Sequence, residues 1–489
     1  MTTGVLGGLE PPLVWERFFE LTRIPRPSKE EEKARAHALE WAAKRGFPSE
    51  VDLAGNAVVR VPPSEGREDA PTVVLQAHLD MVCERDPDST NDAREGRIDV
   101  VLRGDWVRAD GTTLGADNGI GVAAAMAAAE DPDVAHGPLE LLFTVSEEEG
   151  LEGAKALDPA LVSGRLLLNL DGTSDDGLTI GCAGSTHTFV RLALPLESLT
   201  AGHMTHEVVL AGARGGHSGG DIAKGRVNAI KALGRILSRA FQEAPFRLAS
   251  LEGGVSRNAI PREARAVVVL GPEAETAFRA AAEDELEAIV EQYAGSDSIS
   301  LSVDASDARA AAAEAVTERV LDLLATIPSG VVALSPELPD TVETSTSLNV
   351  ATAEDGVLTF ASMTRSSNAP ALDVVEASIE AAARLAGADA EVVRSYPPWR
   401  PDLDSRLLQT ARATFERVMG AEPRLEVVHG GLECAVIGDK LPGIEMISIG
   451  PKVESLHAPG ERLSVSSTQR FYRLLAALLD DLSRKTGIR

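Results

Sequence analysis

The feature of this sequence that most restricts its fold is an alternation of short apolar strands with helices. It fills the first 185 residues and returns after residue 398. Apolar runs predict strands at 57–61, 72–75, 139–145 and 165–170. Helical patterns lie at 15–21, 29–45, 120–129 and 152–157, with Pro27-Ser28 as the expected cap of the second and a loop expected from 76 to 113. Strands that alternate with helices are typical of α/β layers with a largely parallel sheet.

The middle of the chain has a different pattern. Its strands, for example 206–210 and 264–270, alternate polar and apolar residues, and long helices at 227–240 and 273–293 interrupt them. This pattern favours an α+β insert with an antiparallel sheet. After Tyr396-Pro397-Pro398-Trp399 the first pattern resumes, with a helix at 405–419, strands at 424–428 and 445–449, and a final helix from Ser467. We therefore expect a discontinuous domain, 1–185 plus 398–489, that carries an inserted domain, 186–397.

The inserted domain contains two similar stretches, 255–258 and 346–349, each expected to precede a strand and then a long helix. Asn258 and Asn349 are 91 positions apart. This spacing fits two copies of a βαβ-type unit, and chance similarity is the alternative.

Composition excludes several classes of protein. The net charge is −28, from 47 basic and 75 acidic side chains, so no basic surface for nucleic acid is expected. The three cysteines form neither a C-x-x-C pair nor a disulfide framework, which favours a reducing compartment. The N-terminus lacks a signal-peptide pattern, and no apolar run has the length of a membrane span. We expect a cytoplasmic protein with no membrane partner.

A histidine and a carboxylate follow the strand predicted at 72–75. Because successive side chains of a strand alternate between its faces, His78 and Asp80 can point the same way. A metal-binding imidazole usually donates its second N–H to a carboxylate. The pair therefore fits a metal ligand with its orienting carboxylate, although so short a motif also occurs at ordinary polar strand ends.

Other carboxylates occupy similar positions. Asp117 lies among glycines at a helix start, where it would either cap the helix or bridge two metal ions, with a cis bond to Asn118 as one way to orient it. Glu147 and Glu148 follow the strand at 139–145, and Asp171 follows the strand at 165–170. A solvated loop and an Asx turn are the simpler interpretations. Adjacent glutamates diverge, so one can bind metal while the other activates water.

A second histidine, His457, follows the strand at 445–449 and would alone be taken for a surface residue. Together with His78, Asp117, Glu148 and Asp171 it completes a set that lies at strand ends or in adjoining loops, where α/β proteins bind ligands. Nitrogen and oxygen ligands without cysteine suit two divalent ions, most naturally Zn²⁺, with Mn²⁺ and Co²⁺ as alternatives. Such a pair of ions is typical of metal-assisted hydrolysis.

These motifs together resemble the zinc aminopeptidase and aminoacylase superfamily and, within it, the aminoacyl-histidine dipeptidases (Xaa-His or carnosinase-like dipeptidases). The resemblance extends over essentially the whole chain. It rests on 75–82 (Leu-Gln-Ala-His-Leu-Asp-Met-Val), 111–121 (Gly-Thr-Thr-Leu-Gly-Ala-Asp-Asn-Gly-Ile-Gly), 136–140 (His-Gly-Pro-Leu-Glu), 181–184 (Gly-Cys-Ala-Gly), 215–219 (Gly-Gly-His-Ser-Gly) and 429–434 (His-Gly-Gly-Leu-Glu-Cys).

The resemblance implies a zinc-exopeptidase α/β core with the inserted domain as a lid. It implies that His78 and Asp171 hold one zinc ion, that Glu148 and His457 hold the other, and that Asp117 bridges them. Glu147 would be the general base and Asp80 the orienting carboxylate. Family members commonly carry threonine or aspartate before the glutamate pair, where this chain has Ser146, which leaves open a different tuning of the base.

The resemblance also assigns roles in the inserted domain. His217 resembles the lid histidine that contacts the tetrahedral oxyanion, and a structural turn residue is the alternative. Arg365 resembles the arginine that binds the C-terminal carboxylate of a dipeptide, against an ordinary surface arginine. Asn258 and Asn349 are candidates for polar substrate contacts, and Glu433 is the candidate for the substrate's free amino group.

The sequence thus predicts a dinuclear metal dipeptidase for dipeptide substrates, including those with C-terminal histidine. An N-acyl-amino-acid amidohydrolase on the same core and a catalytically silent metal-binding scaffold are the alternatives. A homodimer and a pseudo-dimeric monomer both remain open.

Overall fold

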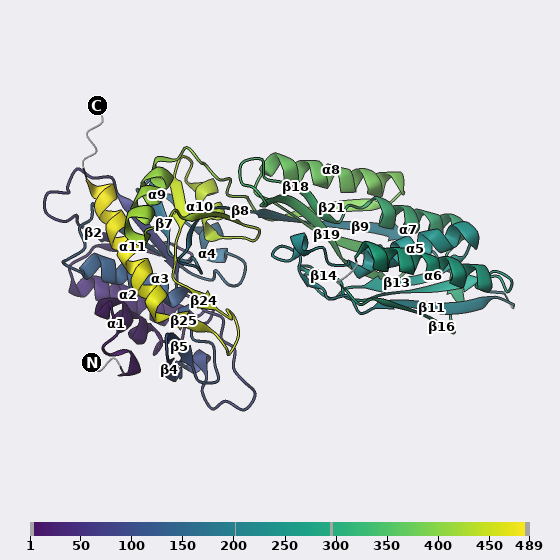
Figure 1. Cartoon of the computed structure of the whole chain (residues 1–489), viewed down its shortest axis with the longest axis horizontal. Coiled ribbons are helices and arrows are strands. Elements are labelled where there is room, and N and C mark those ends of the chain that lie inside the picture. The colour runs from purple at the N-terminus through teal and green to yellow at the C-terminus, as the bar shows by residue number, and fades with distance from the viewer. Residues whose placement is uncertain (1–3, 201, 294–296, 485–489) are drawn as a thin grey trace. The chain divides into compact units, whose positions relative to one another are not determined.

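The computed structural model describes residues 4–200, 202–293 and 297–484, which divide into two compact units (Figure 1). The first unit contains the described residues up to Gly181, those from Trp399 to Val427 and those from Leu432 onward. The second unit contains Cys182–Pro398 and Val428–Gly431. The predicted division at 185/186 and 397/398 lies close to these bounds, except that the prediction assigns 428–431 to the first domain.

The first unit is built around a mixed sheet. Its central strands β6, β3, β7 and β23 are parallel, whereas β1, β2 and β8 pair antiparallel with their neighbours, so the predicted parallel sheet has antiparallel edges. The strands, in sheet order, are β1 (Ser49–Val51), β2 (Ala57–Val61), β6 (Leu139–Thr144), β3 (Val73–His78), β7 (Leu166–Asn169), β23 (Glu445–Ser448), β8 (Gly177–Cys182) and β22 (Arg424–Val428).

Helices enclose this sheet because its central strands are apolar on both faces. Every residue of β3 and of β6 is buried. The Ala-rich helix α3 is buried along almost all its length and packs against α1 and β3. The helices are α1 (Pro12–Leu21), α2 (Glu32–Lys44), α3 (Ala116–Glu130), α4 (Glu152–Ala156), α9 (Arg406–Met419), α10 (Glu433–Lys440) and α11 (Val465–Ser483).

Two local predictions for this unit were wrong. The expected loop at 76–113 contains an antiparallel hairpin, which joins a small sheet of β4 (Val100–Arg103), β5 (Trp106–Ala109), β25 (Arg462–Ser464) and β24 (Val453–Glu454). Ser28 does not cap the second helix, since Glu31 occupies the N-cap position of α2 and the Ser28 hydroxyl donates to Asp80 instead.

The parallel register brings several strand ends to the same edge of the sheet. His78, the last residue of β3, lies beside Thr144, the last residue of β6. Gln76 lies beside Asn169, the last residue of β7. The polar segments that follow these strands therefore start close together.

The second unit is an antiparallel sheet covered by long helices. The strands, in sheet order, are β16 (Ser300–Ala305), β11 (Met204–Ala211), β15 (Ala264–Leu270), β13 (Arg247–Gly253), β19 (Val342–Glu354), β20 (Val357–Ser366), β9 (Gly184–Ala193) and β21 (Asp389–Tyr396), with β18 (Gly330–Leu334) beside β19. Short strand pairs join β12 (Gly216–His217) to β14 (Ala259–Ile260) and β10 (Glu197–Ser198) to β17 (Ala310–Ala311).

The order of elements in this unit repeats. One half runs β11-α5-β13-β15-α6-β16, and the other consists of β9 followed, after that half, by α7-β19-β20-α8-β21. In the sheet the halves meet at β13 and β19, and their strand orders mirror each other. This repetition agrees with the predicted duplication. Asn258 lies in the loop before β14 whereas Asn349 lies inside β19, so the two asparagines do not mark equivalent positions.

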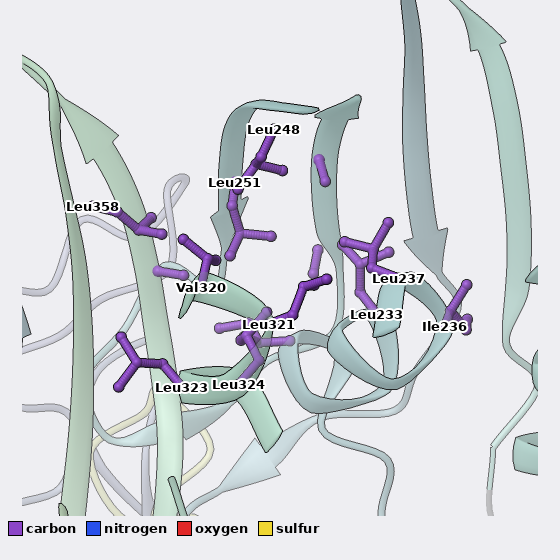
Figure 2. Close-up of a cluster of buried hydrophobic side chains, with 14 of the residues drawn as sticks. Leu233, Ile236, Leu237, Leu248, Leu251, Val320, Leu321, Leu323, Leu324 and Leu358 are labelled. Carbon is purple, nitrogen blue, oxygen red and sulfur yellow. The ribbon is translucent and has the colours of Figure 1, made fainter. Parts of the chain in front are cut away.

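The core of the second unit lies between the sheet and its helices. Figure 2 shows Leu233 and Leu237 of α5, Leu248 of β13 and Leu324 of α7, which all belong to this core. Figure 1 shows these helices running along the sheet: α5 (Ala229–Glu243), α6 (Glu275–Gln292), α7 (Glu314–Thr326) and α8 (Ala369–Leu385). Because strand residues alternate between faces and Val190 and Phe360 belong to this core, His187 and Arg365 belong to the opposite face.

Across the described parts of the chain, no helix has both the length and the apolar character needed to cross a lipid bilayer.

Candidate functional site

The predicted metal ligands of the first unit form one cluster. Nε2 of His78 lies 3.0 Å from Oδ1 of Asp117 and 3.6 Å from Oδ1 of Asp171. Nε2 of His457 lies 3.2 Å from Oδ2 of Asp117 and 3.0 Å from Oε2 of Glu148. The two oxygens of Asp117 therefore face different imidazoles, and each imidazole has a further carboxylate of its own.

The backbone at Asp117 turns its carboxylate into this cluster. Asp117 and Asn118 have non-helical dihedral angles inside α3, and the peptide bond between them is cis, as the sequence analysis considered. The side-chain amide of Asn118 donates to Oδ1 of Asp171 at 2.5 Å and to the carbonyl of Leu170 at 3.0 Å. Asn118 thus holds the carboxylate of Asp171, another predicted ligand.

Asp80 contacts His78 and the loop that follows β6. Oδ1 of Asp80 lies 3.3 Å from Nδ1 of His78, whose other neighbour is the Asp80 carbonyl at 3.2 Å. The Asp80 carboxylate also accepts the backbone N–H groups of Glu147 and Glu148 at 3.0 and 3.1 Å, and the Ser28 hydroxyl at 2.7 Å. Burial opposes its ionisation, but His78 and these donors lower its pKa to about 2, so it stays a carboxylate.

Glu147, the predicted base, lies in a strongly acidic environment. Burial raises its pKa well above the usual value, and although the charge of His78 opposes this rise, the carboxylates of Asp171, Glu433 and Glu148 add to it. A carboxylate with a raised pKa is suited to take up a proton during a reaction.

The residues of this cluster fit divalent cations. Burial disfavours a charged His78, yet Asp171, Asp117 and Asp80 outweigh it and raise its pKa well above the usual value. Hydrogen bonds that His457 donates to Asp117 and Glu148 raise the pKa of His457 to about 10. Oε1 of Glu148 is buried without a hydrogen-bond partner. One ligand atom each from His78, Asp117 and Glu148 lie within 4.8 Å of one another. The cluster has an excess of negative charge and a free ligand atom, which a cation would satisfy.

Glu433, at the start of α10, is buried nearby in the first unit. Its Oε2 accepts from the Gln76 side-chain amide at 2.5 Å and from the Thr144 hydroxyl at 2.8 Å, while Oε1 has no partner. Burial raises its pKa to about 7. These contacts place the Glu433 carboxylate beside Gln76 of β3 and Thr144 of β6. Its role toward a substrate stays a prediction.

Arg365 is a buried charged residue of the second unit. It is only 3% exposed, its NH1 donates to the Tyr396 hydroxyl at 3.1 Å, and its Nε is buried without a partner. Within the described residues of this unit, no carboxylate lies at ion-pair distance from Arg365. A buried guanidinium without a counter-charge is suited to bind an anion.

His217 lies beside Arg365, with 3.4 Å between its Nε2 and NH2 of the arginine. Its Nδ1 accepts the backbone N–H groups of Gly219 and Gly220 at 3.3 and 3.0 Å. The neutral ring carries one N–H, yet both of its nitrogens face donors here, because the guanidinium of Arg365 can only donate toward Nε2. Burial, and then the charge of Arg365, lower the pKa of His217, which favours this neutral form.

The two candidate asparagines have different surroundings. Asn349 is fully buried and donates to the carbonyl of Arg257 at 2.5 Å, so it supports the loop that precedes β14. Asn258 is exposed in that loop, and its carbonyl accepts from the N–H of Ser218 at 2.8 Å. Both therefore support the segment around His217, and their contacts with a substrate stay predictions.

Several supporting residues were missed by the sequence analysis. Glu461 accepts the backbone N–H groups of Leu114, Gly115 and Asp117 at 2.7, 2.8 and 3.1 Å, which fixes the segment that leads into Asp117. Arg26 is buried and donates to the carbonyls of residues 79, 80 and 115. Glu461 stands four positions after His457, which is a weak signal, and nothing in the sequence marks Arg26.

Comparison with known proteins identifies the family. The model of peptidase family M20/M25/M40 matches residues 74–481. The chain belongs to this family. It is 35% identical over 482 residues to the cytosol non-specific dipeptidase of Escherichia coli K12, a match that covers 98% of this chain and 99% of that protein.

Solved structures of the family have the same fold. The aminoacylhistidine dipeptidase of Vibrio alginolyticus is similar with a TM-score of 0.91, 35% identity and 97% of each chain covered. The aminopeptidase PepT of Bacillus cereus shares the fold, with a TM-score of 0.57, 17% identity and coverage of 98% of this chain and 100% of that one. These findings confirm the resemblance and the peptide-hydrolase class inferred from the motifs.

Proposed function

We propose that this family member is a dinuclear metal-dependent dipeptidase. The observation that carries the proposal is the arrangement at Asp117, whose two oxygens face His78 and His457 separately. His78 and Asp171 would hold one ion, Glu148 and His457 the other, with Asp117 between them. Zn²⁺ is the most natural ion for this donor set, with Mn²⁺ and Co²⁺ as alternatives. Bound there, two such ions supply Lewis-acid polarisation of a carbonyl and lower the pKa of water.

The protein's own groups perform the remaining steps. Glu147 takes a proton from the attacking water and passes it to the leaving amine, a transfer for which its raised pKa is suited. His217 stabilises the oxyanion that develops on the scissile carbonyl. Asp80 keeps His78 oriented and holds the backbone of the glutamate loop.

The substrate is a dipeptide with free termini. Arg365 binds its C-terminal carboxylate, which supplies the counter-charge that the guanidinium lacks. Glu433 receives its amino group, and Asn258 and Asn349 are candidates for polar contacts with the substrate. One relative is named as non-specific and another for aminoacylhistidine, so the proposed range is dipeptides in general, with C-terminal histidine included. The cytosol, which appears in the name of the first relative, is the proposed location.

The test compares Ala-His, Ala-Ala and N-acetyl-histidine as substrates of the metal-loaded protein, with and without a chelator. The proposal predicts hydrolysis of both dipeptides, little hydrolysis of the acylated amino acid, and loss of all activity on chelation that added Zn²⁺ or Mn²⁺ restores. Preferred cleavage of N-acetyl-histidine would establish the amidohydrolase alternative. No hydrolysis of any of the three by metal-loaded protein would establish the silent scaffold.

A further inference from the structure

The loop that carries the predicted base is held through its backbone. The N–H groups of three consecutive residues, Ser146, Glu147 and Glu148, all donate to carboxylates. Asp80 receives the second and third of these groups. The first goes to Glu31, a residue with no role in the function proposed above.

Glu31 makes a compact set of contacts with Ser146. Its Oε1 accepts the backbone N–H of Ser146 at 2.8 Å, the Ser146 hydroxyl at 2.9 Å and the backbone N–H of Lys29 at 2.9 Å. Glu31 is only 4% exposed, and Ser146 has a left-handed φ of 50°. A non-glycine residue rarely adopts this conformation, so the contacts that surround it must maintain it.

The segment around Glu31 is itself fixed to the site. The Ser28 hydroxyl donates to Asp80, the Lys29 N–H donates to the Ser146 hydroxyl at 3.1 Å, and Arg26 donates to the Asp80 carbonyl at 2.9 Å. The backbone N–H of Met81 in turn donates to the Arg26 carbonyl at 3.0 Å. The segment that precedes Glu31 is therefore hydrogen-bonded to Asp80 and Met81, which follow the strand that ends at His78.

We propose that Glu31 is a positioning residue for the base Glu147. By accepting the N–H and the hydroxyl of Ser146, it fixes the left-handed turn from which Glu147 projects, and so fixes the direction of the Glu147 carboxylate. Asp80 accepts the N–H groups of both Glu147 and Glu148, so the metal ligand keeps a backbone contact that does not involve Glu31. The inference rests on the proposed function of Glu147, and Glu31 lies outside the residues that the family model matches.

The test uses the full metal-loaded protein and the variants Glu31→Ala and Glu31→Gln. The control is Glu32→Ala, because Glu32 is the next residue in the sequence and its side chain is exposed. For Glu31→Ala we expect kcat to fall about 100-fold, the scale of a misplaced reacting group, while KM and metal content stay unchanged. Hydrogen exchange of the peptide over 145–148 should become faster. Glu31→Gln retains an acceptor oxygen and should restore most of kcat, and Glu32→Ala should equal the parent.

Three results would overturn the inference. These are a kcat of Glu31→Ala equal to that of Glu32→Ala, a loss of kcat that follows an equal loss of metal, and unchanged exchange over 145–148. Should Glu31→Ala fail to fold, Glu31→Asp moves the acceptor oxygen but keeps the charge, and an unchanged kcat in that variant also overturns it. Failure of the proposed function looks different, because the parent protein itself would then hydrolyse no dipeptide.

Discussion

The histidines at the candidate sites of the two units lie in opposite electrostatic environments. In the first unit, carboxylates surround His78 and His457 and raise the pKa of each. In the second unit, burial lowers the pKa of His187, His217 and His429, and the positive charge of Arg365 lowers each of them further.

The difference shows what each unit lacks. The first unit has more negative charge than its imidazoles can balance, and a cation would complete it. The second unit has a buried guanidinium with no carboxylate at ion-pair distance among the unit's described residues, beside imidazoles whose pKa is lowered, and an anion would complete it. Metal ions in the first unit and a substrate carboxylate or oxyanion in the second would satisfy these two needs, as the proposed dipeptidase function requires.

The largest expected effect comes from removing the base in the first unit. Glu147→Ala should lower kcat by about 100- to 10,000-fold, the usual contribution of a general base, while both metal ions remain bound. Kinetics with dipeptide, together with metal analysis of the same preparation, measures this. The matched control is Glu149→Ala, whose exposed side chain pairs only with Lys29 and should leave kcat unchanged. Unchanged turnover in Glu147→Ala would remove Glu147 from this role.

Removing the guanidinium of Arg365 in the second unit should have a smaller effect, and this effect should depend on the substrate. Arg365→Ala should lower kcat/KM for a dipeptide roughly 10- to 100-fold, the value of a charged hydrogen bond. The same change should matter little for a dipeptide amide, because the amide carries no carboxylate to bind. Arg191→Ala, an exposed ion-pair residue on β9, is the control. An equal loss on both substrates would contradict carboxylate binding by Arg365.

The smallest expected effect is on the stability of the second unit in acid. Burial, Arg365 and His217 lower the pKa of His429 to about 4 from its ordinary 6.5. Between these two values the unfolded chain binds more protons than the folded one, so the free energy of unfolding falls as the pH decreases through this window. The loss is at most about 3 kcal/mol.

Hydrogen exchange of β19 and β20 at pH 7 and pH 4.5 measures this loss of stability. His429→Gln should flatten the pH dependence, whereas His203→Gln, an exposed histidine of the same unit, should leave it unchanged. A pH dependence that His429→Gln leaves intact would show that another group titrates.

The sequence predicted much of the candidate metal cluster because His78, Glu148 and Asp171 each follow an apolar strand. Parallel strands bring their carboxyl ends to one edge, so His78, Glu148 and Asp171 could be placed together without coordinates. The sequence also predicted that His457 belongs to the first domain, because the strand–helix pattern resumes after residue 398.

The supporting contacts could not be predicted in this way. Glu31 meets Ser146 across 115 residues of sequence, and Glu461 meets Leu114 across 347. No local periodicity links such pairs, since the fold alone brings them together. The hairpin of β4 and β5 is a different case, because the two residues between its strands, Gly104-Asp105, form a turn of the kind that a sequence pattern predicts.

Anomalous diffraction from crystals of the active, metal-loaded protein tests the central claim most directly. The account predicts two metal peaks, one bound by His78 and Asp171 and one by Glu148 and His457, with an oxygen of Asp117 on each. A fully active protein with a single peak, or with metal peaks away from Asp117, would contradict it.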